Sequence, residues 1–317
     1  MKAIVVSERG GPEVFKVREV DVPEPAARQA RIKMQAASLN YSDIQIAGDF
    51  YPGHIDKRLP YIAGREGAGI VDAVGEEVTD IRPGDRVMAL GLRGAFAEYA
   101  LAIPNILVPI SDQMSFTQAA GLQLPHLTAV AAMEVCGQLK AGDCLLVHAA
   151  ASSVGQAVVR LAKHIGATVV ATASNQDKLD AVAALGADHC INYVTDDFEE
   201  KVRDIVKQGV DVALDTVGGE VLEKTLRVMR PYGRLVIAGN ASNTPVTFSH
   251  YELLSTYRCA LVTLELGTMI IQRPDLMTEV RRRFKMLLDE GVFVMAEPNV
   301  YPLESGPQAL QAMAGLF

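Results

Sequence analysis

In the middle of the chain, residues 144–155 read CLLVHAAASSVG, and this short stretch indicates the architecture of the domain around it. Its first half is a largely apolar run, too short for a helix and typical of a strand buried on both faces. Small residues follow, and apolar residues then recur at helical spacing from Val154 to Ile165. The stretch therefore predicts a strand, a tight turn and a helix in direct succession.

Strands and helices of ordinary length continue to alternate after this stretch, five times in all. The predicted strands cover residues 144–149, 168–172, 187–193, 210–215 and 234–239, with helices at 154–165, 177–185, 198–207 and 221–229. Continuous apolar strands between helices are typical of a parallel sheet covered on both faces. We predict an α/β protein with a Rossmann-type doubly wound sheet over residues 125–265.

The turn between the first strand and helix occupies the place of a phosphate-binding turn. Set against G-x-G-x-x-G, it has Ala150, Ser152 and Gly155 at the three glycine positions. Small residues let the backbone approach a pyrophosphate, and the helix N-terminus offers N–H groups to it. Packing alone can also explain small residues at a tight turn, but the position favours dinucleotide binding. The predicted contacts are Ala151, Ser152, Ser153, Val154 and Gly155.

The end of the second strand bears on the choice of cofactor. NAD-binding folds carry an Asp or Glu there for the ribose 2′-hydroxyl, whereas this chain reads Thr172-Ala173-Ser174. Lys178 follows one helical turn later and, with the Ser174 hydroxyl, would stabilise a 2′-phosphate. Lys178 has an alternative reading as an ordinary solvated helix lysine. The missing acid favours NADPH over NADH.

The rest of the chain has a different character. Up to Pro125, short apolar runs such as 3–6 and 69–74 are broken by Gly and Pro turns, which is typical of a barrel or sandwich. After Thr263 the sequence turns helical and then mixed, and we expect it to return to the first domain. The predicted domains are thus 1–124 with 266–317, and 125–265.

Composition excludes several classes of protein. The 317 residues are 49% hydrophobic, enough for two cored domains, and a net charge of -8 disfavours nucleic acid. No apolar run approaches the ~20 residues of a membrane span, and no targeting segment precedes the strand at 3–6. The four cysteines are widely spaced among apolar residues, so we expect buried thiols and a cytoplasmic protein.

Motifs along nearly the whole chain resemble the medium-chain dehydrogenase/reductase superfamily. They are GREGAGIV at 64–71, PGDRV at 83–87, GAFAEY at 94–99, DHCINY at 188–193 and the segments 211–219 and 233–236. The resemblance implies an N-terminal GroES-like β-barrel catalytic domain, completed by C-terminal residues, with the wound domain inserted. It also implies a homodimer, joined through the apolar, β-branched run at 258–264.

Within that superfamily the chain resembles the zinc-independent quinone oxidoreductases. Arg65 stands where zinc alcohol dehydrogenases have a ligating His, and the segment that would hold the first ligating Cys, AASLNYSD at 36–43, has none. The four-cysteine structural zinc loop is absent as well. Catalytic zinc needs about three protein ligands, and the six histidines show no ligand spacing. We therefore predict no metal site.

The resemblance suggests further cofactor contacts. Asn40 and Thr128 would lie near the nicotinamide, Tyr193 would join Ser174 and Lys178 at the adenosine phosphate, and Gly239 and Asn240 would pass the nicotinamide after the fifth strand. A structural hydrogen bond is the alternative role for each polar residue. Family members usually continue into a further strand after the position of Phe317, so an NADPH-binding arginine found there cannot be carried over.

The predicted reaction is hydride transfer from NADPH to a quinone or another α,β-unsaturated carbonyl. Tyr51 occupies the position of a tyrosine that enoyl reductases of the superfamily place near the substrate. With Asn40 it is a candidate catalytic residue, and it would donate or orient a proton for an alkene substrate. A tyrosine that only lines the cleft is equally compatible. A trans-2-enoyl thioester reductase and a non-catalytic, crystallin-like NADPH-binding protein remain as alternatives.

Overall fold

The structure is a computed structural model that describes residues 1–51, 58–92, 94–294 and 297–315. The chain divides into two compact units, each described here by itself. One comprises residues 1–124 and 295–317, and the other residues 125–294. The first unit is therefore built from both ends of the chain, and the second is inserted between them.

The second unit is built on a six-stranded parallel sheet, as the alternating pattern predicted. Its strands are β9 (Cys144–Val147), β10 (Thr168–Ala173), β11 (His189–Asn192), β12 (Val210–Asp215), β13 (Met229–Ile237) and β14 (Ala260–Thr263). They lie in the order β11-β10-β9-β12-β13-β14, with every neighbouring pair parallel. Leu145, Leu146 and Val147 of β9 are all fully buried, because both faces of the sheet are covered.

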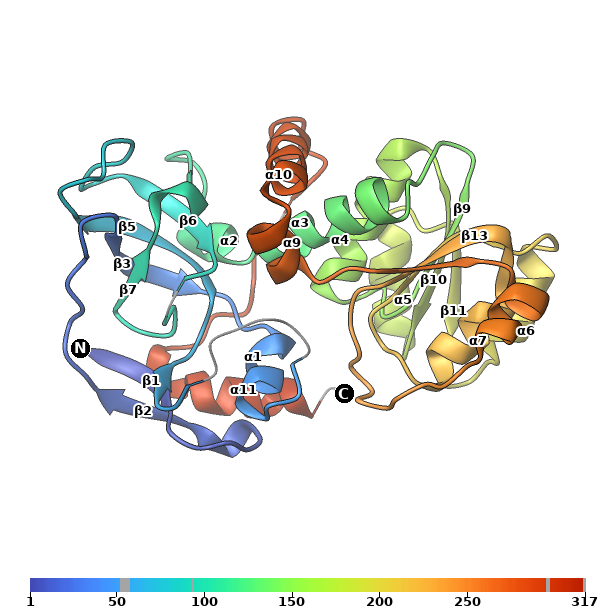
Figure 1. Cartoon of the computed structure of the whole chain (residues 1–317), viewed down its shortest axis with the longest axis horizontal. Helices are drawn as coiled ribbons and strands as arrows, with labels where there is room; N and C mark the ends of the chain where they lie inside the picture. Colours follow the sequence, from blue (N-terminus) through green and yellow to red (C-terminus); the bar gives the residue numbers. More distant parts are fainter. Residues whose placement is uncertain (52–57, 93, 295–296, 316–317) are drawn as a thin grey trace. The chain divides into compact units, whose positions relative to one another are not determined.

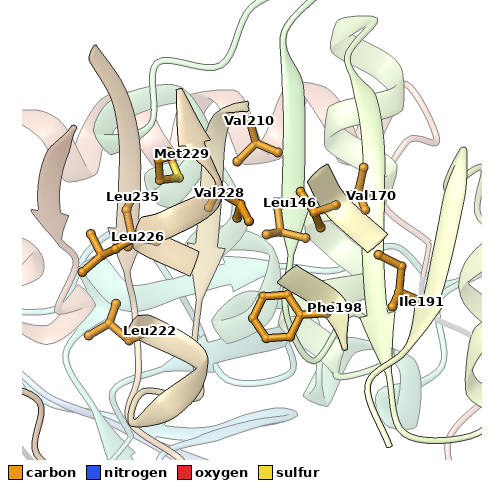
Figure 2. Close-up of a cluster of buried hydrophobic side chains, with 12 residues drawn as sticks. Leu146, Val170, Ile191, Phe198, Val210, Leu222, Leu226, Val228, Met229 and Leu235 are labelled. Atoms are coloured by element: carbon orange, nitrogen blue, oxygen red, sulfur yellow. The ribbon is translucent and has the colours of Figure 1, made fainter. Parts of the chain in front are cut away.

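Helices connect these strands in sequence: α4 (Ser153–Ile165), α5 (Gln176–Ala184), α6 (Phe198–Ile205) and α7 (Glu220–Val228). Because parallel crossovers are right-handed, α4 and α5 cover one face and α6 and α7 the other (Figure 1). Figure 2 shows the core under α6 and α7, a single cluster that contains Phe198 of α6, Leu226 of α7, and Leu146 and Val170 of the sheet. The doubly wound Rossmann prediction is confirmed.

The strand order changes direction between β9 and β12. The chain moves outward from β9 through β10 to β11 and then returns to β12 on the other side. Ligands of such sheets bind outside the carboxyl ends of the strands at this switch point. The segments that follow β9 and β12 are therefore the first places to look for a binding site.

The first unit is an antiparallel β structure, as the Gly- and Pro-rich turns predicted. A five-stranded sheet has the order β7-β3-β5-β6-β8, and a three-stranded one the order β2-β1-β4. The strands are β1 (Lys2–Val6), β2 (Phe15–Glu19), β3 (Ala30–Ala37), β4 (Tyr61–Ile62), β5 (Glu66–Val74), β6 (Arg86–Leu90), β7 (Tyr99–Ala102) and β8 (Leu107–Pro109). Ile32, Val71 and Val87 form part of the larger sheet's buried core.

The two ends of the chain meet in this unit. Helix α11 (Gly306–Ala314) lies beside α1 (Tyr41–Ala47) and β2 (Figure 1). Ile4, Phe15, Ile44 and Leu310 share one buried cluster. A side chain at Gly306 would begin 2.5 Å from the Ile4 side chain, so glycine permits this close approach. The C-terminal residues complete the unit, as the resemblance implied.

The return to the first unit comes later than the expected residue 266. Residues 266–294, with α9 (Leu266–Gln272) and α10 (Pro274–Asp289), belong to the second unit. They pack there against α3 (Gln123–Val130) and the π-helical turn Ala131–Cys136 that continues it. Arg283 pairs with Glu134 at 2.9 Å, and the Phe293 ring meets His126 with centroids 4.5 Å apart. These contacts keep α10 with the unit that precedes it.

The remaining helices are short. They are α2 (Phe116–Ala120), α8 (His250–Glu252), the π-helical turn Leu253–Tyr257 and the 3-10 turns Pro12–Val14, Pro104–Ile106 and Leu303–Ser305. The four cysteines are free thiols, but all are half-buried rather than fully buried as expected. Each lies near an element boundary, where apolar neighbours in sequence do not ensure full cover. Among the described residues, no helix is both long and apolar enough to cross a membrane.

Candidate dinucleotide-binding site

The turn after β9 leads directly into the start of α4. Ala149 adopts a left-handed conformation with φ 48°, and its carbonyl accepts the Ser152 N–H at 2.9 Å. Ser152 caps α4, because its hydroxyl accepts the Gly155 N–H at 3.1 Å. The N–H groups of Ser153 and Val154 begin the helix and have no acceptor in a preceding turn. They and the positive end of the helix dipole can stabilise a phosphate.

Gly155 allows the helix to start so close to the strand. A Cβ atom there would lie 2.6 Å from both the Ala149 carbonyl oxygen and the Ala150 Cα. Real Cβ atoms do not approach backbone this closely, so only glycine fits without moving α4 or the turn. This close packing is the role expected for the third glycine of the motif.

The carboxyl end of β10 carries a polar cluster without an acid. The Lys178 ammonium donates to the Ser174 hydroxyl at 3.0 Å, and its backbone N–H donates to Asn175, which caps α5. Tyr193 follows the neighbouring strand β11 and is 49% exposed, with its N–H on the Ala173 carbonyl. The structure thus brings Ser174 and Lys178 together and places Tyr193 at the next strand end. A hydroxyl and an ammonium suit a phosphate group.

The segments after β12 and β13 pack closely against each other. A Cβ atom on Gly239 would lie 2.8 Å from the Thr216 carbonyl oxygen, and one on Gly218 would overlap the Asn240 side chain. Asp215 is fully buried, and its carboxylate accepts the N–H groups of Val217 and Gly218 at 2.7 and 3.0 Å. Burial raises the pKa of Asp215, although these donors oppose it. Sequence reasoning missed this loop-shaping role, despite an Asp at a strand end before Gly-Gly.

In the first unit, Asn40 is held at both its backbone and its side chain. It caps α1, and its N–H donates to the Asp43 carboxylate at 2.9 Å. Its side-chain nitrogen donates to the Ser38 carbonyl and to the Glu66 carboxylate, both at 3.3 Å. Asn40 is half-buried, so part of its surface remains open to a ligand.

Glu66 and Asp43 are two buried carboxyl groups that sequence reasoning did not select. Glu66 is 1% exposed and accepts the Leu124 N–H at 2.7 Å. Burial raises the pKa of Glu66 to about 7, against the lowering effect of its hydrogen-bond donors. Burial also raises the pKa of Asp43 to about 6, opposed by the Asn40 N–H and the Arg65 charge. Glu66 lies in the GREGAGIV motif, and this position could have pointed to it. We used the motif only for the absence of a zinc ligand at Arg65.

Tyr51 lies in contact with the side chain of Arg65. The Arg65 guanidinium stands over the Tyr51 ring, 5.4 Å from its centroid. Such a cation–π contact orients the ring and its hydroxyl. Residues 52–57 lie outside the described part of the chain.

Thr128 is buried on α3 and belongs to the second unit, whereas Asn40 belongs to the first. A shared contact of these two residues with a nicotinamide therefore stays a prediction. Within the described parts of the chain, no group of three or more His, Cys, Asp or Glu side chains is arranged to hold a metal ion.

The second unit fits a phosphorylated dinucleotide. The turn at 151–155, the Ser174–Lys178 pair, Tyr193 and the segment at Gly239 and Asn240 all follow carboxyl ends of parallel strands, so they share one edge of the sheet. The helix start suits a pyrophosphate, and Lys178 suits the 2′-phosphate that distinguishes NADPH from NADH.

Comparison with known proteins places this site in context. Residues 26–112 match the Alcohol dehydrogenase GroES-like domain family, and residues 153–280 match the Zinc-binding dehydrogenase family. A 2-haloacrylate reductase from Burkholderia sp is 34% identical, with 99% of this chain and 95% of that protein aligned. A quinone oxidoreductase from Pseudomonas aeruginosa is 33% identical, over 90% of this chain and 92% of that one.

The fold of this chain is also similar to solved structures of quinone oxidoreductases. The crystal structure of Escherichia coli quinone oxidoreductase complexed with NADPH superposes with a TM-score of 0.91 at 27% identity, covering 99% of this chain and 97% of that chain. A quinone oxidoreductase from Pseudomonas syringae pv. Tomato gives the same TM-score at 30% identity, over 99% and 96% of the two chains.

Proposed function

We propose a reaction from the premise that this chain belongs to the medium-chain dehydrogenase/reductase superfamily, in its quinone oxidoreductase-like branch. The chain transfers hydride from NADPH to a quinone or another α,β-unsaturated carbonyl, and it does so without zinc. The observation that carries the cofactor choice is the Ser174–Lys178 hydrogen bond at a strand end that lacks a carboxylate. The quinone oxidoreductase relatives support the substrate class.

The residues of the second unit hold and orient the cofactor. The N–H groups at the start of α4 bind the pyrophosphate, and Lys178, Ser174 and Tyr193 bind the 2′-phosphate end. Gly239 and Asn240 border the nicotinamide end of the cofactor. We propose that Thr128 and, from the first unit, Asn40 also contact the nicotinamide. The bound cofactor supplies the hydride, and the protein aligns it and excludes water.

Tyr51 favours a second substrate class beside quinones. Reduction of an activated alkene at its β-carbon requires a proton at the α-carbon, whereas a reduced quinone oxygen can take its proton from water. The Tyr51 ring is oriented under Arg65 and offers such a proton donor. The 2-haloacrylate reductase among the relatives is named for an alkene substrate. Enones therefore stand beside quinones in the proposed substrate class, and trans-2-enoyl thioesters are the alternative substrates.

A turnover assay separates these possibilities. Purified protein is mixed with NADPH and, in parallel, with a small quinone, an enone and an enoyl thioester, and NADPH consumption is followed. We expect the quinone or the enone to be reduced well above the rate without protein. Binding of NADPH without turnover of any of the three would instead indicate a non-catalytic, crystallin-like protein.

Zinc should be neither present nor needed. Arg65 cannot ligate a cation, and the described residues offer no cluster of ligands. Dialysis against a chelator should therefore leave the rate of quinone reduction unchanged. Elemental analysis that finds one zinc per chain, together with a loss of activity in chelator, would contradict this proposal.

We further propose a cytoplasmic homodimer with a small-molecule substrate and no nucleic-acid partner. The net charge of -8 supports the last point, because phosphate backbones repel an acidic protein. Four free thiols fit a reducing compartment.

A further inference from the structure

The side-chain amide of Asn40 can adopt only one orientation in its present surroundings. Its nitrogen lies 3.3 Å from the Ser38 carbonyl oxygen and 3.3 Å from the Glu66 carboxylate. Both neighbours are acceptors, so a rotation of the amide by a half-turn would bring oxygen against oxygen. The two N–H groups are thus committed to the protein, and the amide carbonyl is left on the side of the Asp43 N–H, in the capping box at the start of α1.

Glu66 is the common acceptor of this arrangement. One carboxylate oxygen accepts from Asn40 at the start of α1, and the other accepts the Leu124 N–H in the first turn of α3 at 2.7 Å. The Gln123 N–H is a further donor. Because Glu66 itself begins β5 and is 1% exposed, one carboxylate joins the starts of α1, β5 and α3 through residues that all belong to the first unit. Such a buried acidic group is stable only while these donors remain in place.

We propose that Glu66 is a positioning residue for the reaction: its carboxylate holds the Asn40 amide in one orientation, and a neutral carboxyl group releases it. This inference rests on the proposed function, since that function places Asn40 beside the nicotinamide. An ionised carboxylate accepts from every donor around it. A protonated one carries a hydrogen on one oxygen, which then competes with the Asn40 or the Leu124 N–H group.

Glu66 should become neutral, and so release the Asn40 amide, in the neutral pH range. Burial raises the pKa of Glu66 to about 7. The charge that acts on it from α1 is Asp43, which raises the pKa further. Arg65 and Tyr61 adjoin Asp43 in turn, and Arg65 lowers the pKa of that carboxyl. Removal of the Asp43 charge should therefore lower the pKa of Glu66 without abolishing its titration.

Glu66→Gln is the central variant. The glutamine has the same shape, but its NH2 group must face either Asn40 or the backbone donors of α3. We expect Asn40 to rotate and kcat/KM for quinone to fall about tenfold above neutral pH, the worth of one hydrogen bond to a charged group. The wild type should lose kcat/KM as pH falls through about 7, because Glu66 becomes neutral. Glu66→Gln should lack this pH dependence.

Asp43→Asn is the matched control, because it replaces the other buried carboxyl of the cluster by an amide that can still accept the Asn40 N–H. It should keep the loss of kcat/KM at low pH but move it to lower pH. A purely structural role for Glu66 would instead lower the melting temperature of Glu66→Gln and leave the shape of the pH profile unchanged. That outcome would overturn the proposal.

A second measurement needs no substrate or cofactor. In 15N-labelled wild-type protein, the side-chain NH2 resonances of Asn40, assigned with an Asn40→Asp variant, should shift with an apparent pKa near that of Glu66. Resonances independent of pH between about 5 and 8, around the expected pKa of a buried carboxyl, would refute the inference even if Glu66→Gln did not fold. A wild type that shows the shift but reduces no substrate would refute the proposed function and leave the Glu66–Asn40 coupling intact.

Discussion

Lys178 is the residue to which we attribute the preference for NADPH. Its ammonium is aligned by Ser174 at 3.0 Å, next to a strand end without an acid. Lys178→Ala should weaken NADPH binding by about 1.5–3 kcal/mol, the worth of hydrogen bonds to a charged group, and leave NADH binding nearly unchanged. Calorimetry with both cofactors measures this difference. Lys207→Ala, at an exposed lysine of the same unit, is the control; an equal loss for NADH would contradict the assignment.

Tyr51 separates the two substrate classes. Tyr51→Phe keeps the ring under Arg65 and removes only the hydroxyl. If Tyr51 protonates an alkene substrate, the variant should reduce an enone about 10²-fold more slowly, the usual size of a general-acid effect. Quinone reduction should change little, because water can protonate the product. Steady-state rates on both substrates test this, and an equal loss on both would mean that Tyr51 orients the cofactor or the fold.

Residues could be predicted from the sequence where their partners are close in sequence. Ser174 and Lys178 are four positions apart at a helix start, so their hydrogen bond follows from local geometry. Glu66 could not be selected in this way, because its partners Asn40 and Leu124 lie 26 and 58 positions away. Only the folded chain brings those groups to one buried carboxylate.

Strand β9 is tied to its neighbours by a buried histidine. The His148 ring nitrogens contact the Thr172 hydroxyl of β10 at 3.1 Å and the Thr225 hydroxyl of α7 at 2.8 Å. Burial lowers the pKa of His148 to about 3 from 6.5. Because the folded pKa is the lower one, this group's contribution to stability is complete above pH ~6.5 and is lost as the pH falls toward ~3.

His148→Gln should therefore flatten the acid side of the stability profile. The amide can still bond to either threonine but does not titrate. Between pH 7 and 5 the wild type should lose about 2 kcal/mol of unfolding free energy to this one group, and the variant should not. Urea unfolding at several pH values measures the loss. His164→Gln, at a half-exposed histidine on α4, should keep the wild-type slope, and the same slope in His148→Gln would refute the prediction.

Helices and strands could be predicted where apolar residues recur at a regular spacing. The unit to which each element belongs could not always be predicted. The alternation from β9 to β13 follows from apolar runs and helical spacing that each segment carries alone. Helix α10 was also expected as a helix, yet it packs in the second unit rather than the first. An amphipathic pattern shows that a helix buries one face. The pattern does not say against which core the helix packs. In this chain α10 packs in the second unit, where Arg283 pairs with Glu134 and Phe284 contacts His126.

The molecule as a whole is an insertion of one folding unit into another. Ile4 and Leu310 come from opposite ends of the chain and share one hydrophobic core. The parallel sheet of the second unit, which lies between them in sequence, has a separate hydrophobic core. Composition and charge could predict two domains but not this arrangement. The inserted arrangement was predicted from the resemblance to the medium-chain dehydrogenase/reductase superfamily. The motifs of that resemblance lie on both sides of the insertion point near Leu124.

The assembly prediction concerns the free edge of the parallel sheet. Strand β14 pairs with β13 on one side, and within the described residues no strand pairs with its other side. The Leu264 N–H donates to Ile237 of β13 at 2.9 Å, so the N–H of the preceding Thr263 points away from β13. Apolar edges of this kind tend to pair with another chain. A second copy of this chain would continue the sheet.

Light scattering at micromolar concentration should therefore give the mass of a dimer. Thr263→Pro removes the outward N–H and leaves the bonds to β13 in place, so it should shift the mass toward that of one 34.1 kDa chain. Thr263→Val has a similar shape and keeps the N–H, and it should remain dimeric. Circular dichroism confirms that both variants are folded. A monomeric wild type, or a dimer that survives Thr263→Pro, would mean that the edge of β14 is not the dimer contact, because a shared sheet cannot form without its backbone donors.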